Sequence, residues 1–226
     1  MAKVISTLDN AISKLNTLLE LDSTAPSSGD EDYTVWTDLL NTAVNLWENE
    51  EGTLWNELFV KLDSGQGGDT STSADDFSYA LPTLFRFPAS GYVWLGSGTN
   101  KTAFKVIKQH EVQLFENNSE NWCYFLLDSS PTLEFNPNCT FDASLTINYN
   151  YYKWATALST GSDSFEMSDP MFAVYYALAE LTKEEGNAQS LNLASQKLEA
   201  MKTRNSMPAW FQEDSFTRNT GTGFGT

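Results

Sequence analysis

The sequence predicts an α+β protein, with a small bundle of two N-terminal and two C-terminal helices and a β-sandwich-like sheet inserted between them. Three observations predict this fold. Apolar residues recur at three- and four-residue steps near both ends of the chain, over about residues 4–50 and 169–204. Short aromatic and β-branched runs separated by Gly, Pro, Asn and Ser fill residues 77–154. The polar, Thr- and Gly-rich residues 215–226 predict an extended C-terminal arm.

The first two predicted helices cover about residues 4–21 and 33–50. Each has one apolar face, formed by Val4, Ile5, Leu8, Ile12, Leu15, Leu18 and Leu19 in the first helix and by Trp36, Leu39, Leu40, Ala43, Val44 and Trp47 in the second. Asp30 or Asp32 can cap the second helix, and Gly52 is expected to end it.

The middle of the chain predicts strands. Residues 53–62 suit a strand or its approach, and the Gly-, Ser-, Thr- and Asp-rich residues 63–76 predict a mobile surface loop. We expect five or six strands in residues 77–154, in a small sandwich or curled sheet, and a helical turn at about 109–116. The strand-like runs are Leu84–Phe87, Tyr92–Leu95, Phe104–Ile107, Trp122–Leu127, Leu133–Phe135 and Leu145–Tyr152.

Helices return after Ser168-Asp169-Pro170, a strong helix-start signal. One helix is expected to run to about Lys183 and another over about 188–204. The predicted organisation is a discontinuous helical domain of residues 1–62 and 155–208, an inserted β domain of residues 77–154 and a tail of residues 209–226.

Composition excludes several classes of protein. The 226 residues include 13 Lys and Arg against 30 Asp and Glu, which gives a net charge of -17. A strongly basic nucleic-acid binder and a binder of anionic membranes are therefore disfavoured. No window approaches the ~18 apolar residues of a membrane span. Met1–Asp9 has no apolar signal region, so we expect synthesis and folding in a cytoplasm with reduced thiols.

No residue pattern predicts a catalytic, cofactor or metal site. His110 is the only histidine, and we expect it to be a solvated surface residue. The Gly-rich stretches at 65–68 and 96–98 lack the Lys-Ser/Thr of a phosphate-binding loop and predict turns. The acidic residues form no calcium loop, and no spacing selects a glycosidase pair, so they predict solvated acidic faces.

Three further groups of residues stand out. Cys123 and Cys139 are expected to be small buried hydrophobes. The stripe of Tyr149, Tyr151, Tyr152 and Trp154 is either a ligand platform or, as we favour, a strand that packs its rings against the helices. The rings of Trp210 and Phe211, next to the polar tail, are expected to dock on a partner or on the chain's own core.

One longer pattern resembles a known family. It joins a Tyr-rich strand at 147–153 to a short Ala-Leu-Ser loop and then to two helices, with the quoted residues Ala157-Leu158-Ser159, Asp169-Pro170-x-Phe172, Tyr175-Tyr176, Gly186-Asn187 and Lys197-Leu198-Glu199-Ala200-Met201-Lys202. This resembles the C-terminal half of the head–tail connector, or adaptor, proteins of tailed bacteriophages, a group that includes tail tubular protein A of short-tailed phages. The order of elements agrees over most of residues 1–205. Trp154-Ala155 departs from it, because many relatives have a proline-containing turn there.

The resemblance implies a structural virion protein without catalytic residues. Such proteins form a ring, usually twelve-fold, that joins the portal protein at the capsid vertex to the tail or neck protein below. Genomic DNA passes through the ring during ejection without specific binding. The helical part would dock on the portal and the β part would meet the tail. An extended C-terminal arm reaches the portal in related adaptors, and the residues that suit this arm here are Trp210, Phe211, Phe216, Arg218 and Phe224.

The implied location is the neck of the virion, after synthesis in the cytoplasm of the host bacterium. A ring of acidic subunits would present a lumen that repels DNA, and like-charged subunits would remain monomeric without the portal. Three alternatives stay open. One is another neck or tail component, such as a stopper, a tail terminator or a tail fibre adaptor. Another is a carbohydrate-binding or glycosidase module, which predicts exposed coplanar rings on one face. The third is a helical-repeat scaffold, which residues 169–204 support with only one helix pair.

Overall fold

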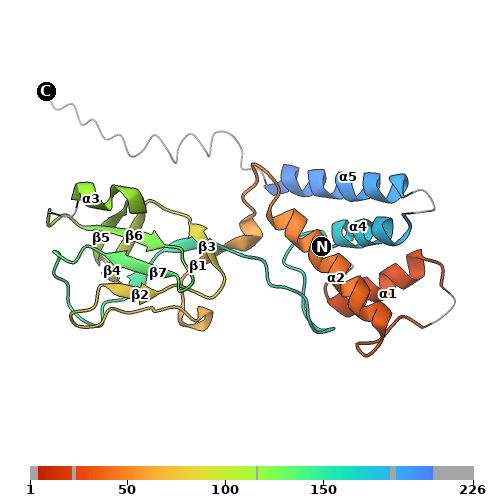
Figure 1. Ribbon diagram of the computed structural model, residues 1–226, viewed down its shortest axis with the longest axis horizontal. Helices are drawn as coiled ribbons and strands as arrows, with labels where there is room; N and C mark the ends of the chain where they lie inside the picture. Colours follow the sequence, from red (N-terminus) through yellow and green to blue (C-terminus); the bar gives the residue numbers. More distant parts are fainter. Residues whose placement is uncertain (1–4, 22–23, 116, 184–186, 206–226) are drawn as a thin grey trace, which may run out of the picture. The chain divides into compact units, whose positions relative to one another are not determined.

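The protein is an α+β chain that divides into two compact units. The computed structural model describes residues 5–21, 24–115, 117–183 and 187–205 (Figure 1). Residues 1–57 and 157–226 belong to one unit, here called the helical unit, and residues 58–156 form the other, here called the β unit. The sequence assigned residues 58–62 to the helical domain, but strand β1 (Phe59–Lys61) pairs with a strand of the β unit.

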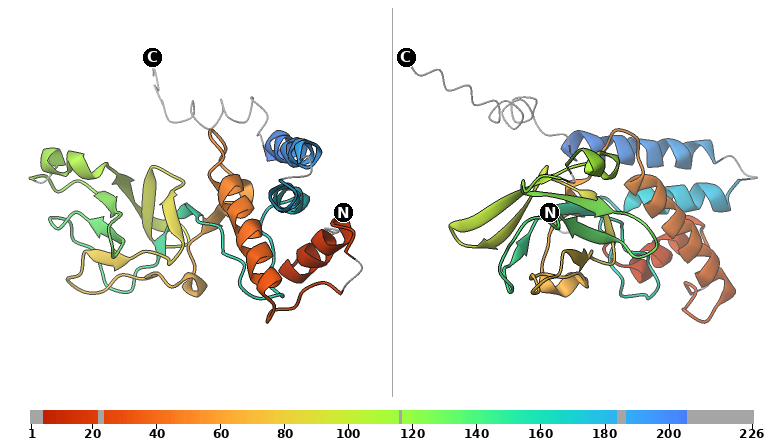
Figure 2. Two further views of the ribbon diagram at one scale, coloured as in Figure 1. Left: turned by 45° about the vertical axis from the view of Figure 1, so that its right-hand side comes forward. Right: turned by 60° about the vertical axis from the view of Figure 1, so that its left-hand side comes forward.

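The helical unit contains α1 (Leu8–Leu18), α2 (Glu31–Glu48), α4 (Met171–Leu181) and α5 (Ala188–Asn205). Helix α4 packs against the other three, and Figures 1 and 2 show it side by side with α5. Six of its eleven residues are buried, because neighbouring helices cover it on several sides. The two ends of the chain therefore share one core.

The helix ends differ in detail from the sequence prediction. The Thr7 hydroxyl accepts a hydrogen bond from the Asn10 amide, so α1 begins at Leu8 rather than near residue 4. Asp30 precedes α2, but its carboxylate accepts hydrogen bonds from the amide and hydroxyl of Ser27 instead of capping the helix. Helix α2 ends at Glu48, and Gly52 lies in the turn that follows, with φ of 72°.

Two asparagine side chains fix the segments that lead out of the helical unit and back into it. The amide group of Asn41, on α2, accepts from the Leu158 N–H at 2.8 Å and donates to the Leu158 carbonyl at 2.9 Å. Asn205, at the end of α5, accepts from the Asn56 N–H at 2.8 Å and donates to the Leu54 carbonyl at 2.7 Å. Each pair joins residues more than 100 positions apart in the chain. We call these pairs the asparagine clamps.

The β unit holds nine strands among its described residues, more than the five or six predicted. They are β1, β2 (Ser78–Ala80), β3 (Phe85–Pro88), β4 (Tyr92–Ser97), β5 (Asn100–Val106), β6 (Trp122–Leu126), β7 (Thr132–Phe135), β8 (Ile147–Asn148) and β9 (Asn150–Lys153). One sheet has the order β1-β9-β3, and a curled mixed sheet has the order β2-β7-β6-β5-β4-β8. Among the strand pairs of residues 58–115 and 117–156, only β5–β6 is parallel. Between β5 and β6 the chain forms a short 3-10 turn (Gln109–Glu111) and then α3 (Val112–Phe115). These elements confirm the helical turn predicted at about 109–116.

Residues 69–72 bridge the two edge strands of the curled sheet. The Asp69 N–H donates to the Ala80 carbonyl of β2, and the Ile147 N–H of β8 donates to the Thr70 carbonyl. The buried Thr72 hydroxyl adds bonds to the Asp142 carbonyl and from the Leu145 N–H. The sequence prediction of a mobile loop over 63–76 is therefore wrong for this stretch, because its backbone satisfies strand edges that would otherwise stay open.

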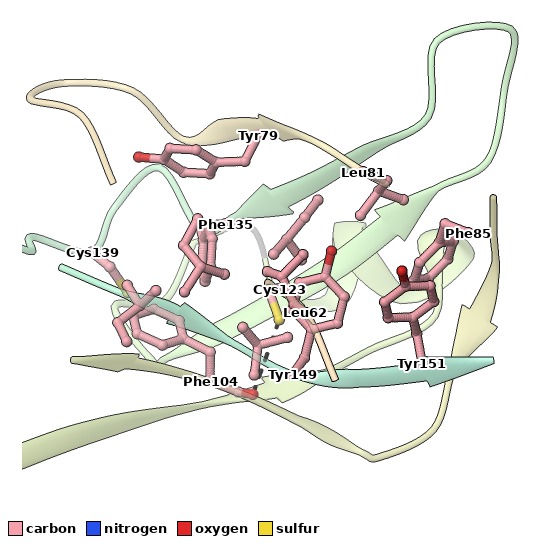
Figure 3. Packing of buried hydrophobic residues seen from close by; sticks show 14 residues of the cluster. Leu62, Tyr79, Leu81, Phe85, Phe104, Cys123, Phe135, Cys139, Tyr149 and Tyr151 are labelled. Carbon is pink, nitrogen blue, oxygen red and sulfur yellow. Dashed lines mark hydrogen bonds between the residues drawn. The ribbon is translucent and has the colours of Figure 1, made fainter. Parts of the chain in front are cut away.

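The core of the β unit is aromatic (Figure 3). Tyr149 and Tyr151 lie on one face of the chain, as their alternation predicted, and both are almost fully buried. Their ring partners belong to the β unit, and not to the helices that the sequence analysis favoured. The Tyr151 ring stacks on Phe85 with centroids 5.3 Å apart, and the Tyr149 ring meets Phe125 edge-on at 5.5 Å. The strand that carries Tyr149 and Tyr151 therefore packs its rings against other strands of the β unit.

We predict that Asn41→Ala destabilises the helical unit by about 1–3 kcal/mol, because it leaves the Leu158 N–H and carbonyl without the partners of the clamp. Chemical denaturation monitored by circular dichroism measures the loss. The matched control is Asn45→Ala, an exposed position one turn further along α2. Equal stability of the two variants would show that the clamp contributes nothing.

We predict that Thr72→Val costs about 1–3 kcal/mol of β-unit stability, since valine keeps the shape of threonine but loses both hydroxyl bonds. Hydrogen exchange should report faster opening at Leu145 and Ile147. Thr70→Val, two residues away with only its backbone bonded to β8, serves as the control and should leave exchange unchanged.

Candidate interaction surfaces

The described residues contain no group of three or more His, Cys, Asp or Glu side chains that could hold a metal ion. His110 lies exposed in the 3-10 turn after β5, as predicted. The acidic residues Asp30, Glu31 and Asp32 line a pocket of about 330 Å³ beside Trp36. Hydrogen bonds from Ser27 lower the pKa of Asp30, whereas the general acid of a glycosidase needs a raised pKa.

Cys123 and Cys139 are free and buried, as the sequence predicted for small apolar residues. Cys123 lies on β6 in the aromatic core, and the Cys139 thiol donates to the Glu120 carbonyl at 3.2 Å. Burial raises the pKa of both thiols. Because the thiolate is the reactive form, neither group is suited to be a nucleophile near neutral pH.

The largest pocket we describe, about 590 Å³, lies in the β unit. Two glycines of the 63–76 stretch, Gly65 and Gly67, line it together with Tyr151 and Lys153. Gly67 has φ of 77°, and a Cβ there would come within 2.9 Å of the Thr83 hydroxyl. These glycines form a turn, as predicted.

Three aromatic rings form a ladder across the outer face of the three-stranded sheet. Phe59 and Phe87 both pair in register with Tyr152 of the central strand. The Phe59 ring meets Tyr152 at 5.6 Å and 71°, and the Phe87 ring lies 5.2 Å from Tyr152. Nearby, the Arg86 guanidinium lies 4.3 Å from the centroid of the Trp154 ring. Since Phe59 is 45% exposed, the ladder is accessible, but its rings are not coplanar.

A second outer face, formed by β4 and β5, combines rings with lysines. Tyr92 lies opposite Lys105 in the antiparallel register, and Gly96 lies opposite Lys101. Tyr92 is 40% exposed, and its ring centroid is 6.1 Å from that of Trp94. Both lysines are exposed and form no ion pair with any residue that the structure describes. We call this the lysine face.

Charge is distributed unevenly between the units. The helical unit carries 20 of the 30 Asp and Glu and 7 of the 13 Lys and Arg. The nine strands of the β unit, in contrast, contain five Lys and Arg and the single acid Glu134. The negative charge of the chain therefore belongs mainly to the helical unit and to loops.

Sequence reasoning missed the lysine face and the aromatic ladder. A charge count over whole regions masks the positive charge of the strands, because acids in the loops, such as Asp69 and Asp142, cancel the lysines of the strands. A count restricted to the six predicted strand-like runs does not reveal the face either, because they hold Arg86 and Lys105 against Glu134 and leave out Lys101. The five residues proposed for the arm (Trp210, Phe211, Phe216, Arg218 and Phe224) lie outside the described residues, so the structure brings none of them to a site.

No protein-family model matches the chain, and no curated protein matches it. Among the helices of the described residues, none combines the length and apolar character that crossing a membrane requires.

We predict that iodoacetamide at mildly alkaline pH alkylates Cys123 and Cys139 at least about tenfold more slowly than the exposed thiol of His110→Cys. Burial limits access of the reagent to the two native thiols and also raises their pKa. Mass spectrometry of quenched samples measures the rates. In denaturant the three thiols should react alike. Fast labelling of the folded wild-type chain would contradict the buried positions of Cys123 and Cys139.

Proposed function

We propose that this chain is a structural virion protein that forms a ring, twelve-fold by resemblance, between the portal at the capsid vertex and the tail or neck below. The observation that carries the proposal is the architecture. Both ends of the chain build one helical bundle, and the β unit is inserted between them. This is the order of elements that the resemblance to head–tail connectors implies.

Charge supports the same function. The helical unit carries an excess of 13 acidic residues. Repeated around a ring, such a surface would repel the phosphate backbone and let DNA pass without adhering.

The carbohydrate-binding alternative is less well supported. A sugar platform needs exposed rings lying in one plane, and the Phe59 and Tyr152 rings meet at 71°. The Tyr92 and Trp94 rings, at 35°, come nearer to this arrangement, but two lysines flank them. A glycan screen remains the next experiment if the portal test below fails.

We predict that the full-length chain co-sediments with the portal protein encoded in the same genome, as a ring of fixed stoichiometry, while the purified chain alone forms no stable ring and is monomeric in dilute solution. A chain truncated after Gln212 should bind at least about tenfold more weakly, because it lacks three of the five arm residues, Phe216, Arg218 and Phe224. Analytical ultracentrifugation and electron microscopy of the pelleted complex give the stoichiometry.

A matched variant separates the arm rings from simple shortening of the chain. Phe216→Ser with Phe224→Ser in the full-length chain should reproduce the weakened binding of the truncated chain, whereas Thr220→Ser should not. If the full-length and truncated chains bind the portal equally, the connector function stands but the proposed role of the arm is wrong. Failure of the full-length chain to bind the portal would remove the connector function.

A further inference from the structure

We propose that the lysine face of the β unit is a subunit contact that binds the solvent-exposed stripe of α2 in a second copy of this chain. The inference rests on the proposed ring, because a closed ring needs two different surfaces that meet head to tail. It names these two surfaces. One is Tyr92, Trp94, Lys101 and Lys105 on β4 and β5, and the other is Glu31, Val35, Asp38 and Leu46 on α2.

The lysine face has the composition of a contact surface. Val93 and Leu95 of β4 point into the core, so the alternating residues Tyr92 and Trp94 lie outside. The exposed Ala103 of β5 lies opposite Trp94 and leaves its ring uncovered from that side. Strands β4, β5 and β8 contain no acid that could neutralise the lysines. Rings at the centre and charges at the rim are typical of protein interfaces.

The stripe on α2 has the complementary composition. Val35 and Leu46 are 44% and 47% exposed, although most apolar residues of this helix are buried. Glu31 and Asp38 are exposed on the same helix, and neither forms an ion pair with a described residue. Acids elsewhere in the helical unit do have partners, as Glu50 does in Lys202 and Asp169 in Lys197. Helix α2 therefore presents unpaired acids beside exposed apolar side chains.

The two surfaces also agree in length. Lys101 and Lys105 are separated by four residues of strand, or about 13 Å along the strand. Glu31 and Asp38 are separated by seven residues of helix, or about 10 Å along its axis, and Val35 and Leu46 by about 16 Å. A strand pair with two lysines can thus meet both carboxylates at once, with Val35 between them, while Leu46 extends the apolar stripe about 12 Å beyond Asp38.

A second copy explains this face better than nucleic acid does. Exposed rings with lysines on a curled sheet also suit single-stranded nucleic acid. Two lysines, however, neutralise at most two phosphates, and the chain as a whole carries a net charge of -17. Between copies, the excess acid of the helical unit supplies the opposite charge, and the contact needs only short-range ion pairs around an apolar centre.

The decisive experiment uses carbodiimide, which joins a lysine to a carboxylate only when they are in contact. The full-length chain is prepared unlabelled and labelled with nitrogen-15, mixed in equal amounts, concentrated and treated. We expect crosslinked peptides of mixed isotope that join Lys101 or Lys105 to Glu31 or Asp38. Crosslinks at these positions that always carry one isotope would be intramolecular and would overturn the proposal, as would their complete absence.

Charge exchange tests the pairing directly. Lys101→Glu with Lys105→Glu should reduce the mixed-isotope crosslinks at least tenfold, and so should Glu31→Lys with Asp38→Lys. A mixture of the two double variants should restore intermolecular crosslinks between the substituted positions, because each ring contact then pairs opposite charges again. The matched control is Lys61→Glu with Lys108→Glu, which changes the net charge equally at exposed positions off the lysine face and should leave crosslinking intact. If the mixture of the two double variants shows no intermolecular crosslinks, the proposed pairing of the lysine face with α2 is wrong.

Two further outcomes separate this contact from its alternatives. If a single-stranded oligonucleotide binds the wild-type chain, and Lys101→Glu with Lys105→Glu abolishes that binding while crosslinking is absent, the face belongs to nucleic acid and the proposal falls. If mixed-isotope crosslinks form but the chain never binds a portal, the contact between copies stands and the connector function fails. The two hypotheses therefore fail in distinguishable ways.

Discussion

The fold depends on how the helical unit holds the two segments that connect it to the β unit. Asn205 binds the backbone of Leu54 and Asn56 just before the chain leaves the helical unit, and Asn41 binds the backbone of Leu158 just after it returns. An asparagine amide offers a donor and an acceptor side by side, so one side chain satisfies both polar groups of an extended segment. Both connections are thereby fixed without a strand pair. The stacked rings of Trp47 and Trp55 give the outgoing segment an apolar anchor as well.

The β unit consists of short strands, whose edges would expose unpaired backbone groups. Its strands are two to seven residues long, and the edge strands β2 and β8 are among the shortest. Residues 69–72 bind both of them, so the ends of the curled sheet are covered by the same chain. Inside, the rings of Phe85, Phe104 and Phe135 fill the space, where edge-to-face pairs add to the burial of apolar surface. Such a unit can present outer faces to a partner without exposing strands to uncontrolled pairing.

How much of this was predictable follows from the range of the interactions. The four helices, the sheet between them, the burial of Tyr149 and Tyr151 and the exposure of His110 follow from local periodicity and composition, and the structure confirms them. The asparagine clamps and the edge contacts of residues 69–72 were not predictable, because Asn41 and Thr72 act on partners 117 and 70 residues away. The predicted capping of α2 by Asp30 failed for a local reason, because the Asp30 carboxylate accepts hydrogen bonds from Ser27 instead of from the helix. The lysine face was missed because acids in the loops, such as Asp69 and Asp142, cancel its two lysines when charge is counted over whole regions.

The net charge of the chain therefore describes its two units poorly. Acids concentrate in the helical unit and in loops, while the strands carry five cations and one acid. Uniformly acidic subunits could only repel one another, but a chain with a cationic face on one unit and an anionic helix on the other can attract its own copies in one orientation. Long-range repulsion between whole chains then keeps this attraction weak in solution. A scaffold that concentrates the copies at one place would overcome that repulsion, because neighbours held close together pair at a high effective concentration. On this basis, pairs of copies would form weakly in concentrated solution, and a complete ring would assemble only after the copies dock on their partner.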